Sequence, residues 1–204
     1  MSFKNQTKIK VADVSCNNKT ITVFYKGDEE VVKNNCIAIV GTRQPTNEVK
    51  DLTEKIIDKL VKSYGEKLTI VSGCAYGVDT LALSYAQDQE ISTIGVLPSG
   101  LLNPLPVNNV DLANNCTMLI SQFGLHNKIV KGGPLARNEV IAGLCDCMVV
   151  PQINLKTGGT KNAINHAVNM GKKVFMPVLD GRNFNGNQRI IKQGLALPLN
   201  ISGE

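Results

Sequence analysis

Short segments of glycine, hydroxyl and basic residues follow several apolar runs in this chain. Glycine lets backbone N–H groups approach a ligand closely, and the start of a helix favours a bound anion. Side-chain hydroxyls add further donors. These residue types favour binding of a phosphate-containing group, in a nucleotide or in a nucleic-acid backbone. The segments are Gly41-Thr42-Arg43, Ser72-Gly73 with Gly77 and Asp79, Ser99-Gly100, Ser121, and Lys156-Thr157-Gly158-Gly159-Thr160.

Asp79 and Arg137 are charged residues whose roles the sequence leaves open. Asp79 follows Gly77 at the start of a predicted helix, where a carboxylate can cap free N–H groups and complement the helix dipole. Alternatively, it holds a ligand hydroxyl or a basic neighbour such as Arg43. Arg137 and Asn138 open a later predicted helix and are candidates for the same ligand site.

No catalytic constellation is visible in the sequence. No nucleophile, base and acid fall together near the predicted strand ends, and His166 lies on a predicted helix face. The glycine segments match neither the P-loop nor the G-x-G-x-x-G fingerprint. The six cysteines lie mostly in apolar segments and form no C-x-x-C pair, which favours buried reduced thiols over a metal site or a disulfide framework. We therefore expect a binding site without chemistry, and neither a cofactor nor a metal.

Apolar runs and helix-like periods alternate between residues 36 and 194, which predicts a parallel sheet with helices on both faces. The fold class is therefore α/β and Rossmann-like, in a domain of residues 36–204. Residues 1–35 alternate apolar and polar side chains and predict a small antiparallel β extension packed on this core. The expected strands are 8–14, 19–27, 36–40, 68–73, 92–100, 117–123, 147–152 and 172–178, and the expected helices are 46–60, 78–87, 108–116, 135–146, 160–171 and 187–194.

Composition narrows the function classes. The chain has 204 residues, of which 43% are hydrophobic and 19% charged, as in ordinary globular domains. Aromatic residues make up 4%, which weakens a binding mode built on base stacking. No apolar run approaches the ~20 residues of a membrane span, and no signal-peptide core is present, so we expect a cytoplasmic protein without membrane contact. The net charge is +5.

Basic residues concentrate in the last quarter of the chain. Between Lys156 and Lys192 the sequence holds one acid, Asp180, so this segment suits a polyanionic ligand if its basic side chains share a face. A solvated lysine-rich surface fits the same composition. The basic residues are Lys156, Lys161, Lys172, Lys173, Arg182, Arg189 and Lys192.

Several motifs resemble the DprA (Smf) family of DNA-processing proteins, part of a wider Rossmann-like superfamily that includes lysine-decarboxylase-like phosphoribohydrolases. The resemblance runs from about residue 23 to residue 196 and covers only the family's core, without the N-terminal helical and C-terminal winged-helix-like domains of many relatives. The order and spacing of the motifs make the match specific. The motifs are "CIAIVGTR", "SGCAYGVDTLA", "GVLPSGLLNPLPVNN", "LISQFG", "RNEVIAGLCDCMVV" and "TGGTKNAINHAVNMGKKVFMPV".

This resemblance implies single-stranded DNA binding in a basic pocket at the sheet edge, with no hydrolysis. It also implies a homodimer and the loading of a RecA-type recombinase during uptake of transforming DNA. The binding candidates that it transfers are Gly41, Thr42, Arg43, Ser72, Gly73, Gly77, Asp79, Asn109, Arg137, Asn138, Gly158 and Thr160; Gly100, Lys156, Thr157 and Gly159 are added from their positions after strands.

The chain departs from the family pattern at four positions. Glu139 stands where the family usually has arginine, which puts an anion near the expected pocket and predicts weaker phosphate binding. Leu83, Leu105 and Gln122 replace the family's usual histidine, aromatic residue and glutamate.

Two other functions remain open on the same fold. A nucleotide-derived signal could be bound for sensing or sequestration. A phosphoribohydrolase acting on nucleoside monophosphates is the least favoured, because Asn162 and Ala163 stand where its loop requires an acid.

Overall fold

A computed structural model describes residues 8–103, 109–179, 181 and 184–201. Among the residues singled out from the sequence, Leu105, Asp180 and Arg182 lie outside this described part.

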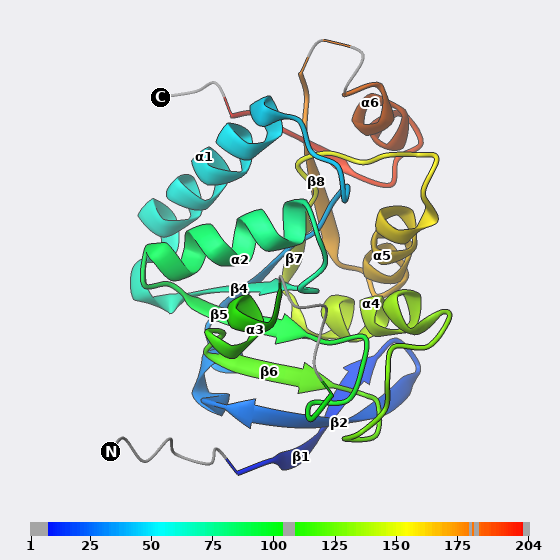
Figure 1. Cartoon of the computed structure of the whole chain (residues 1–204). Coiled ribbons are helices and arrows are strands. Elements are labelled where there is room, and N and C mark those ends of the chain that lie inside the picture. The colour runs from blue at the N-terminus through cyan, green and yellow to red at the C-terminus, as the bar shows by residue number, and fades with distance from the viewer. Residues whose placement is uncertain (1–7, 104–108, 180, 182–183, 202–204) are drawn as a thin grey trace.

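Within the described residues, nine strands form one sheet in the order β1-β2-β6-β5-β4-β3-β7-β8-β9. In this spatial order, all neighbouring strands from β6 through β3 to β9 pair in parallel. The sheet twists strongly from β6 to β9 (Figure 1). The strands are β1 Lys10–Cys16, β2 Lys19–Gly27, β3 Asn35–Ile39, β4 Leu68–Ser72, β5 Ser92–Val96, β6 Met118–Ser121, β7 Cys147–Val149, β8 Lys173–Pro177 and β9 Leu197–Leu199.

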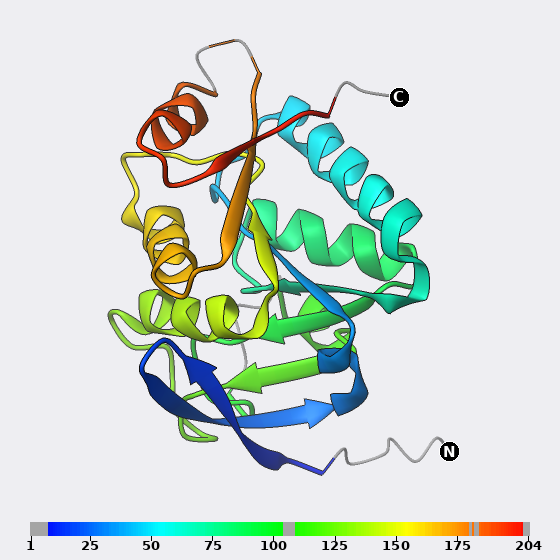
Figure 2. The same ribbon diagram turned by 180° about the vertical axis from the view of Figure 1, so that it is seen from behind.

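Helices cover both faces of the sheet, as the two opposite views show (Figure 1, Figure 2). The first three helices pack on one face and the last three on the other. Two short 3-10 helices, Glu29–Lys33 and Gly65–Lys67, precede β3 and β4. The α-helices are α1 Asn47–Tyr64, α2 Val78–Asp88, α3 Val110–Asn114, α4 Gly133–Leu144, α5 Gly158–Asn169 and α6 Asn185–Lys192.

The two-sided burial follows from the side-chain alternation of the strands. In β3, Ile37 and Ile39 pack under α1 and α2, whereas Cys36 and Ala38 join the core under α4 and α5. All five residues of β4 are buried. Near-continuous apolar strands are therefore required at the centre of the sheet, as the sequence predicted.

The β1–β2 hairpin continues the same sheet, because β2 pairs antiparallel with β6. Lys19 pairs with Glu139 of α4 at 2.8 Å between Nζ and Oε2. The predicted Rossmann-like sheet with its small antiparallel extension is thus confirmed. The domain boundary at residue 35 stays a prediction, since hairpin and core share one sheet.

The sequence did not predict β9 or the 3-10 helices. β9 is only three residues long and contains Pro198, which weakens any strand signal.

No helix in the described part of the chain is both long enough and apolar enough to span a lipid bilayer. All six cysteines are free thiols; four are buried, and Cys116 and Cys147 are half-buried.

Candidate functional site

A pocket of about 330 Å³ lies beyond the carboxyl ends of β3 and β7, where the strand order reverses. Such a reversal opens a crevice between loops that diverge to opposite faces of the sheet, and ligands of open α/β sheets bind there. We call this cavity the switch-point pocket. It is lined by Val40, Gly41, Arg43, Ala75, Asp79, Gly132, Pro134, Leu135, Arg137, Asn138, Thr157, Gly159, Thr160 and Ala163.

Asp79 and Arg137 form a buried ion pair in this lining. Arg137 Nη2 lies 3.6 Å from Asp79 Oδ2, and the two side chains are 5% and 7% exposed. Arg137 Nη1 donates to the Val96 carbonyl at 2.9 Å. Burial raises the pKa of Asp79 against the opposing effect of Arg137, and burial lowers the pKa of Arg137. The pair therefore fixes α2 against α4, and the basic neighbour of Asp79 is Arg137, not Arg43 as we suggested.

The turn from β4 into α2, residues 73–77, is closed around the Asp79 carboxylate. The Gly73 N–H donates to Oδ2 at 3.2 Å, and the backbone N–H groups of Ala75 and Gly41 lie close enough to favour the ionised carboxyl. A Cβ on Gly73 would stand 1.4 Å from Arg137 Nη1. The expectation that the Gly73 N–H faces a ligand is therefore wrong, because Asp79 uses it.

Gly77 is also required by packing. Its φ is 86°, and a Cβ there would lie 2.3 Å from the Thr42 carbonyl oxygen. That carbonyl accepts from the Val78 N–H at 3.1 Å, so the first turn of α2 is satisfied within the protein. This turn, which we call the closed turn, positions the pocket wall and offers few free donors.

The turn that leads into α5, taken with the first three residues of the helix (154–160), is open instead. Added Cβ atoms on Gly158 and Gly159 would meet nothing within 4 Å. The N-cap residue Thr157 makes no side-chain cap bond, so the first N–H groups of α5 have no helical or capping acceptor. Asn138 ties this turn to α4, because its Nδ2 donates to the Gly159 carbonyl at 3.1 Å. We call residues 154–160 the open turn. The N–H groups of Lys156 and Thr157 donate to Asn154, whereas an anion can approach the N–H groups at the start of α5 directly.

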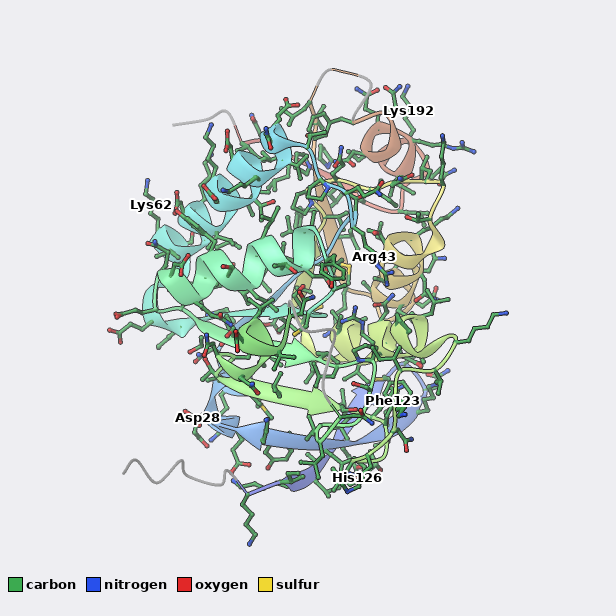
Figure 3. All side chains as sticks on the ribbon, in the orientation of Figure 1. Asp28, Arg43, Lys62, Phe123, His126 and Lys192 are labelled. Carbon is green, nitrogen blue, oxygen red and sulfur yellow. The ribbon has the colours of Figure 1, made fainter. Side chains whose placement is uncertain are left out.

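Arg43 is the exposed cation of the switch-point pocket. Its side chain lies between the start of α2 and α5 (Figure 3), and no ion pair forms with it among the described residues. Because Asp79 neutralises Arg137, the guanidinium of Arg43 is the uncompensated positive charge in the lining.

Some predicted residues support the site from outside the lining. The Ser72 hydroxyl donates to the Ile39 carbonyl at 2.6 Å, and Thr42 accepts from the Gln44 N–H through its hydroxyl. Asn109 donates to the Cys74 carbonyl at 2.7 Å. All three side chains are buried, so they position strand ends and loops.

Gly100 lies away from the switch-point pocket. A Cβ there would be 2.1 Å from the Gly124 carbonyl oxygen, and its N–H donates to Asn127. Position 100 therefore requires glycine because the loop after β6 approaches it closely. Lys156 and Gly158 are exposed beside the pocket, on the open turn.

The start of α4, which forms one wall of the pocket, was not predicted correctly from the sequence. α4 begins at Gly133, so Arg137 and Asn138 lie one turn inside the helix instead of opening it. Gly132, with a φ of 86°, and Pro134 stand at this helix start, a pattern that could have revealed it.

Glu139 does not line the pocket, contrary to the expectation from the sequence. Its carboxylate pairs with Lys19 of the hairpin. The substitution therefore changes how the hairpin is held, and its predicted weakening of phosphate binding has no structural support. Leu83 is fully buried in the core under α2.

The basic residues after Lys156 do not share one face. Lys156 and Lys161 are exposed near the start of α5, beside the pocket. Lys172 directly precedes β8 and Lys173 is its first residue, so both lie at the opposite edge of the sheet. Of these four lysines, Lys156 and Lys161 add positive potential beside the pocket.

The family model of DNA recombination-mediator protein A matches residues 9–202. Over 183 residues the chain is 30% identical to DNA processing protein DprA of Streptococcus pneumoniae, covering 87% of this chain and 63% of the relative. It is 32% identical over 181 residues to DprA of Bacillus subtilis, covering 84% of this chain and 59% of that protein. The chain thus spans about three fifths of the length of these relatives.

A solved structure of DNA processing protein A from Helicobacter pylori superposes with a TM-score of 0.82 at 26% sequence identity. It covers 98% of this chain and 94% of that one, and it was described for its single-stranded DNA binding mode. An X-ray structure of the Streptococcus pneumoniae protein gives a TM-score of 0.79 at 29% identity, over 87% of this chain and 62% of that one.

Proposed function

The chain belongs to the DNA recombination-mediator protein A family, and from this premise we propose that it binds single-stranded DNA at the switch-point pocket. One observation carries the proposal: the exposed guanidinium of Arg43 and the open turn face the same cavity. A guanidinium and free helix N–H groups are complementary to a phosphate. The Helicobacter pylori relative, described for its single-stranded DNA binding mode, supports this choice of ligand.

The geometry suggests how a strand is held. A phosphate sits against the N–H groups at the start of α5, and Arg43 contacts the same or the next phosphate. Lys156 and Lys161 extend the positive rim on the α5 side, and Lys131, exposed next to Gly132, extends it on the α4 side. A rim that is basic on both sides of the pocket favours a ligand with several phosphates over a single nucleotide.

Salt dependence distinguishes DNA from a small nucleotide signal. A strand that releases counterions from several phosphates loses affinity steeply as salt rises, whereas a mononucleotide shows a much flatter slope. We expect the steep dependence. The family match does not favour the nucleotide-signal alternative.

The proposal assigns no reaction to the pocket. Its one carboxylate, Asp79, is buried against Arg137, and Asn162 and Ala163 occupy the positions where a phosphoribohydrolase loop needs an acid. The expectation that the chain is not an enzyme stays a prediction. Release of nucleobase from AMP above background would contradict it.

A homodimer, the loading of a RecA-type recombinase, a role in DNA recombination and transformation, and a cytoplasmic location also belong to the proposal. Their support is the family membership alone. Sedimentation of the purified chain tests the dimer, and co-sedimentation with a RecA-type recombinase tests the partner.

Arg43→Ala tests the binding site directly. Loss of a charge-assisted contact should weaken oligo-dT binding about tenfold in a filter-binding titration. Lys62→Ala is the matched control, because Lys62 is an exposed cation near the far end of α1 (Figure 3). Equal affinities of wild type and Arg43→Ala would refute the pocket. Arg137→Ala is a poorer test, since it leaves Asp79 buried without its partner.

A further inference from the structure

Two cysteine sulfurs lie close to Gly95, near the carboxyl end of β5. A Cβ built on Gly95 would lie 2.8 Å from Cys74 Sγ and 3.1 Å from Cys116 Sγ. The two sulfurs are therefore at most about 5.9 Å apart, the sum of those distances. Cys74 belongs to the closed turn, and Cys116 follows α3. Glycine at position 95 leaves the space that the two thiols share.

The two thiols differ in environment. Cys74 is 3% exposed, whereas Cys116 is half-buried. The side-chain interaction between the two thiols raises the pKa of Cys74 and lowers the pKa of Cys116. Cys116 Sγ also accepts from Gln87 Nε2 at 3.5 Å. Donated hydrogen bonds favour a thiolate, so Cys116 is the better nucleophile of the pair.

The residues on both sides of Cys116 in the chain line a surface hollow. A second hollow, of about 380 Å³, is lined by Gln87, by Thr93 and by Asn115 and Thr117, the chain neighbours of Cys116. Gln87 is also the donor to the Cys116 sulfur, so the hollow adjoins the thiol.

We propose that Cys74 and Cys116 form a reversible redox site, in which a hydroperoxide oxidises Cys116 and Cys74 then closes a disulfide. The Cys116 thiolate attacks a peroxide oxygen; an S–O bond forms, the O–O bond breaks, and hydrogen peroxide leaves one water after protonation. The Cys74 sulfur then attacks the sulfenic sulfur; the S–S bond forms, the S–O bond breaks, and hydroxide leaves as water with the Cys74 proton. Two thiols and one peroxide give a disulfide and two waters.

The disulfide would act on the closed turn. An S–S bond of about 2.05 Å requires the sulfurs to approach and the side chains to adopt a restricted dihedral angle. Cys74 has a φ of 53°, its carbonyl accepts from Asn109, and the preceding Gly73 N–H donates to Asp79. Movement of Cys74 is therefore transmitted to Asp79 and from there to Arg137 in the switch-point pocket. This consequence rests on the proposed function, whereas the disulfide itself does not.

The test exposes the native chain to hydrogen peroxide and measures its intact mass, its peptide map and its oligo-dT affinity. We expect loss of two hydrogen atoms, one peptide pair linking residues 74 and 116, and affinity about fivefold weaker, the lower end of typical coupling between sites. Dithiothreitol should restore mass and affinity. Hydrogen exchange of residues 73–79 should change on oxidation whether or not the chain binds DNA.

Variants separate the steps. Cys116→Ser should abolish the disulfide, and Cys74→Ser should leave a sulfenic acid on Cys116 that dimedone captures. Cys147→Ser is the matched control, because Cys147 is a half-buried cysteine whose pKa is raised by burial; this variant should leave the disulfide intact.

Free Cys74 and Cys116 thiols after peroxide treatment overturn the redox site. A disulfide that leaves hydrogen exchange of the closed turn unchanged overturns the linkage. Absence of oligo-dT binding by the reduced protein refutes the proposed function only.

Discussion

The closed turn and the open turn are both rich in glycine but differ in what surrounds those glycines. Both follow a buried parallel strand, contain two glycines and lead into a helix. In the closed turn the glycines are enforced by contact with Arg137 and Thr42, and Asp79 uses the N–H groups. In the open turn, Cβ atoms added to the glycines would meet nothing within 4 Å, and Thr157, Gly159 and Thr160 line the pocket. A glycine-rich turn after a strand can thus be required by packing, as in the closed turn, or border open space, as in the open turn.

The feature that separates them is a carboxylate within reach of the turn. Asp79 stands in the first turn of α2, whereas the first turn of α5 contains no acid. An acid at that position binds the helix N–H groups in place of an external anion. The comparison predicts effects on stability for the closed turn and on binding for the open turn.

The largest effect is expected from Asp79→Ala. Removing it leaves the Arg137 guanidinium buried without a counter-charge and the Gly73 N–H without an acceptor, so the free energy of unfolding should fall by about 4 kcal/mol. Urea unfolding followed by circular dichroism measures the loss. Asp88→Ala, at the exposed end of the same helix, is the control and should change little. A stable Asp79→Ala protein would mean that the closed turn is not held by this carboxylate.

Gly77→Ala should follow, with a loss of about 3 kcal/mol, because it combines an unfavourable φ with overlap on the Thr42 carbonyl. Gly171→Ala separates the two causes. Gly171 has a φ of 69° and no atom within 4 Å of an added Cβ, so only the backbone cost of about 1 kcal/mol should remain. Equal losses in the two variants would remove packing from the explanation.

Gly158→Pro should weaken oligo-dT binding about tenfold with little change in stability. Proline fits the first position of a helix but lacks the N–H donor. The preceding Thr157 already has the extended backbone that proline requires, with φ of −111° and ψ of 126°. The lost donor to a phosphate is worth about 1.5 kcal/mol. Wild-type affinity in this variant would show that DNA does not use the open turn.

The smallest effect is expected from Gly158→Ala, which keeps the N–H group. Alanine should raise the free energy of unfolding by up to about 1 kcal/mol, because nothing obstructs its Cβ and it restricts the unfolded chain. Thermal unfolding measures the gain. A loss would indicate that Gly158 has a conformational role like that of Gly77.

The sequence predicted the fold well because its signal is local. Buried strands such as Leu68–Ser72 are short apolar runs, and α1 has one apolar face, so periodicity identifies them without knowledge of their neighbours. The three-residue strands carry too few side chains for such a pattern. β7 was predicted because Cys147–Val149 lies in a longer apolar segment, whereas β9 was missed.

The site was predicted less completely because its chemistry depends on partners distant in sequence. The predicted strand ends lie at the edge that holds the pocket, and several predicted residues line it, including Gly41, Arg43 and Thr160. The ion pair of Asp79 with Arg137 joins two helices, and no local sequence pattern predicts it. The same holds for Glu139, whose partner Lys19 lies in the hairpin. Which candidates contact DNA stays a prediction.

The hairpin also constrains the order in which the chain folds. Cys16 contacts the Glu139 carbonyl across a sequence separation of 123 residues, and β2 needs β6 as its partner strand. During synthesis, the hairpin leaves the ribosome before β6 and α4, so it must wait until α4 has emerged before it can dock. Such long-range pairing slows folding and leaves two amphipathic strands exposed meanwhile. We expect the hairpin to be among the last elements to gain protection in pulse-labelling hydrogen exchange.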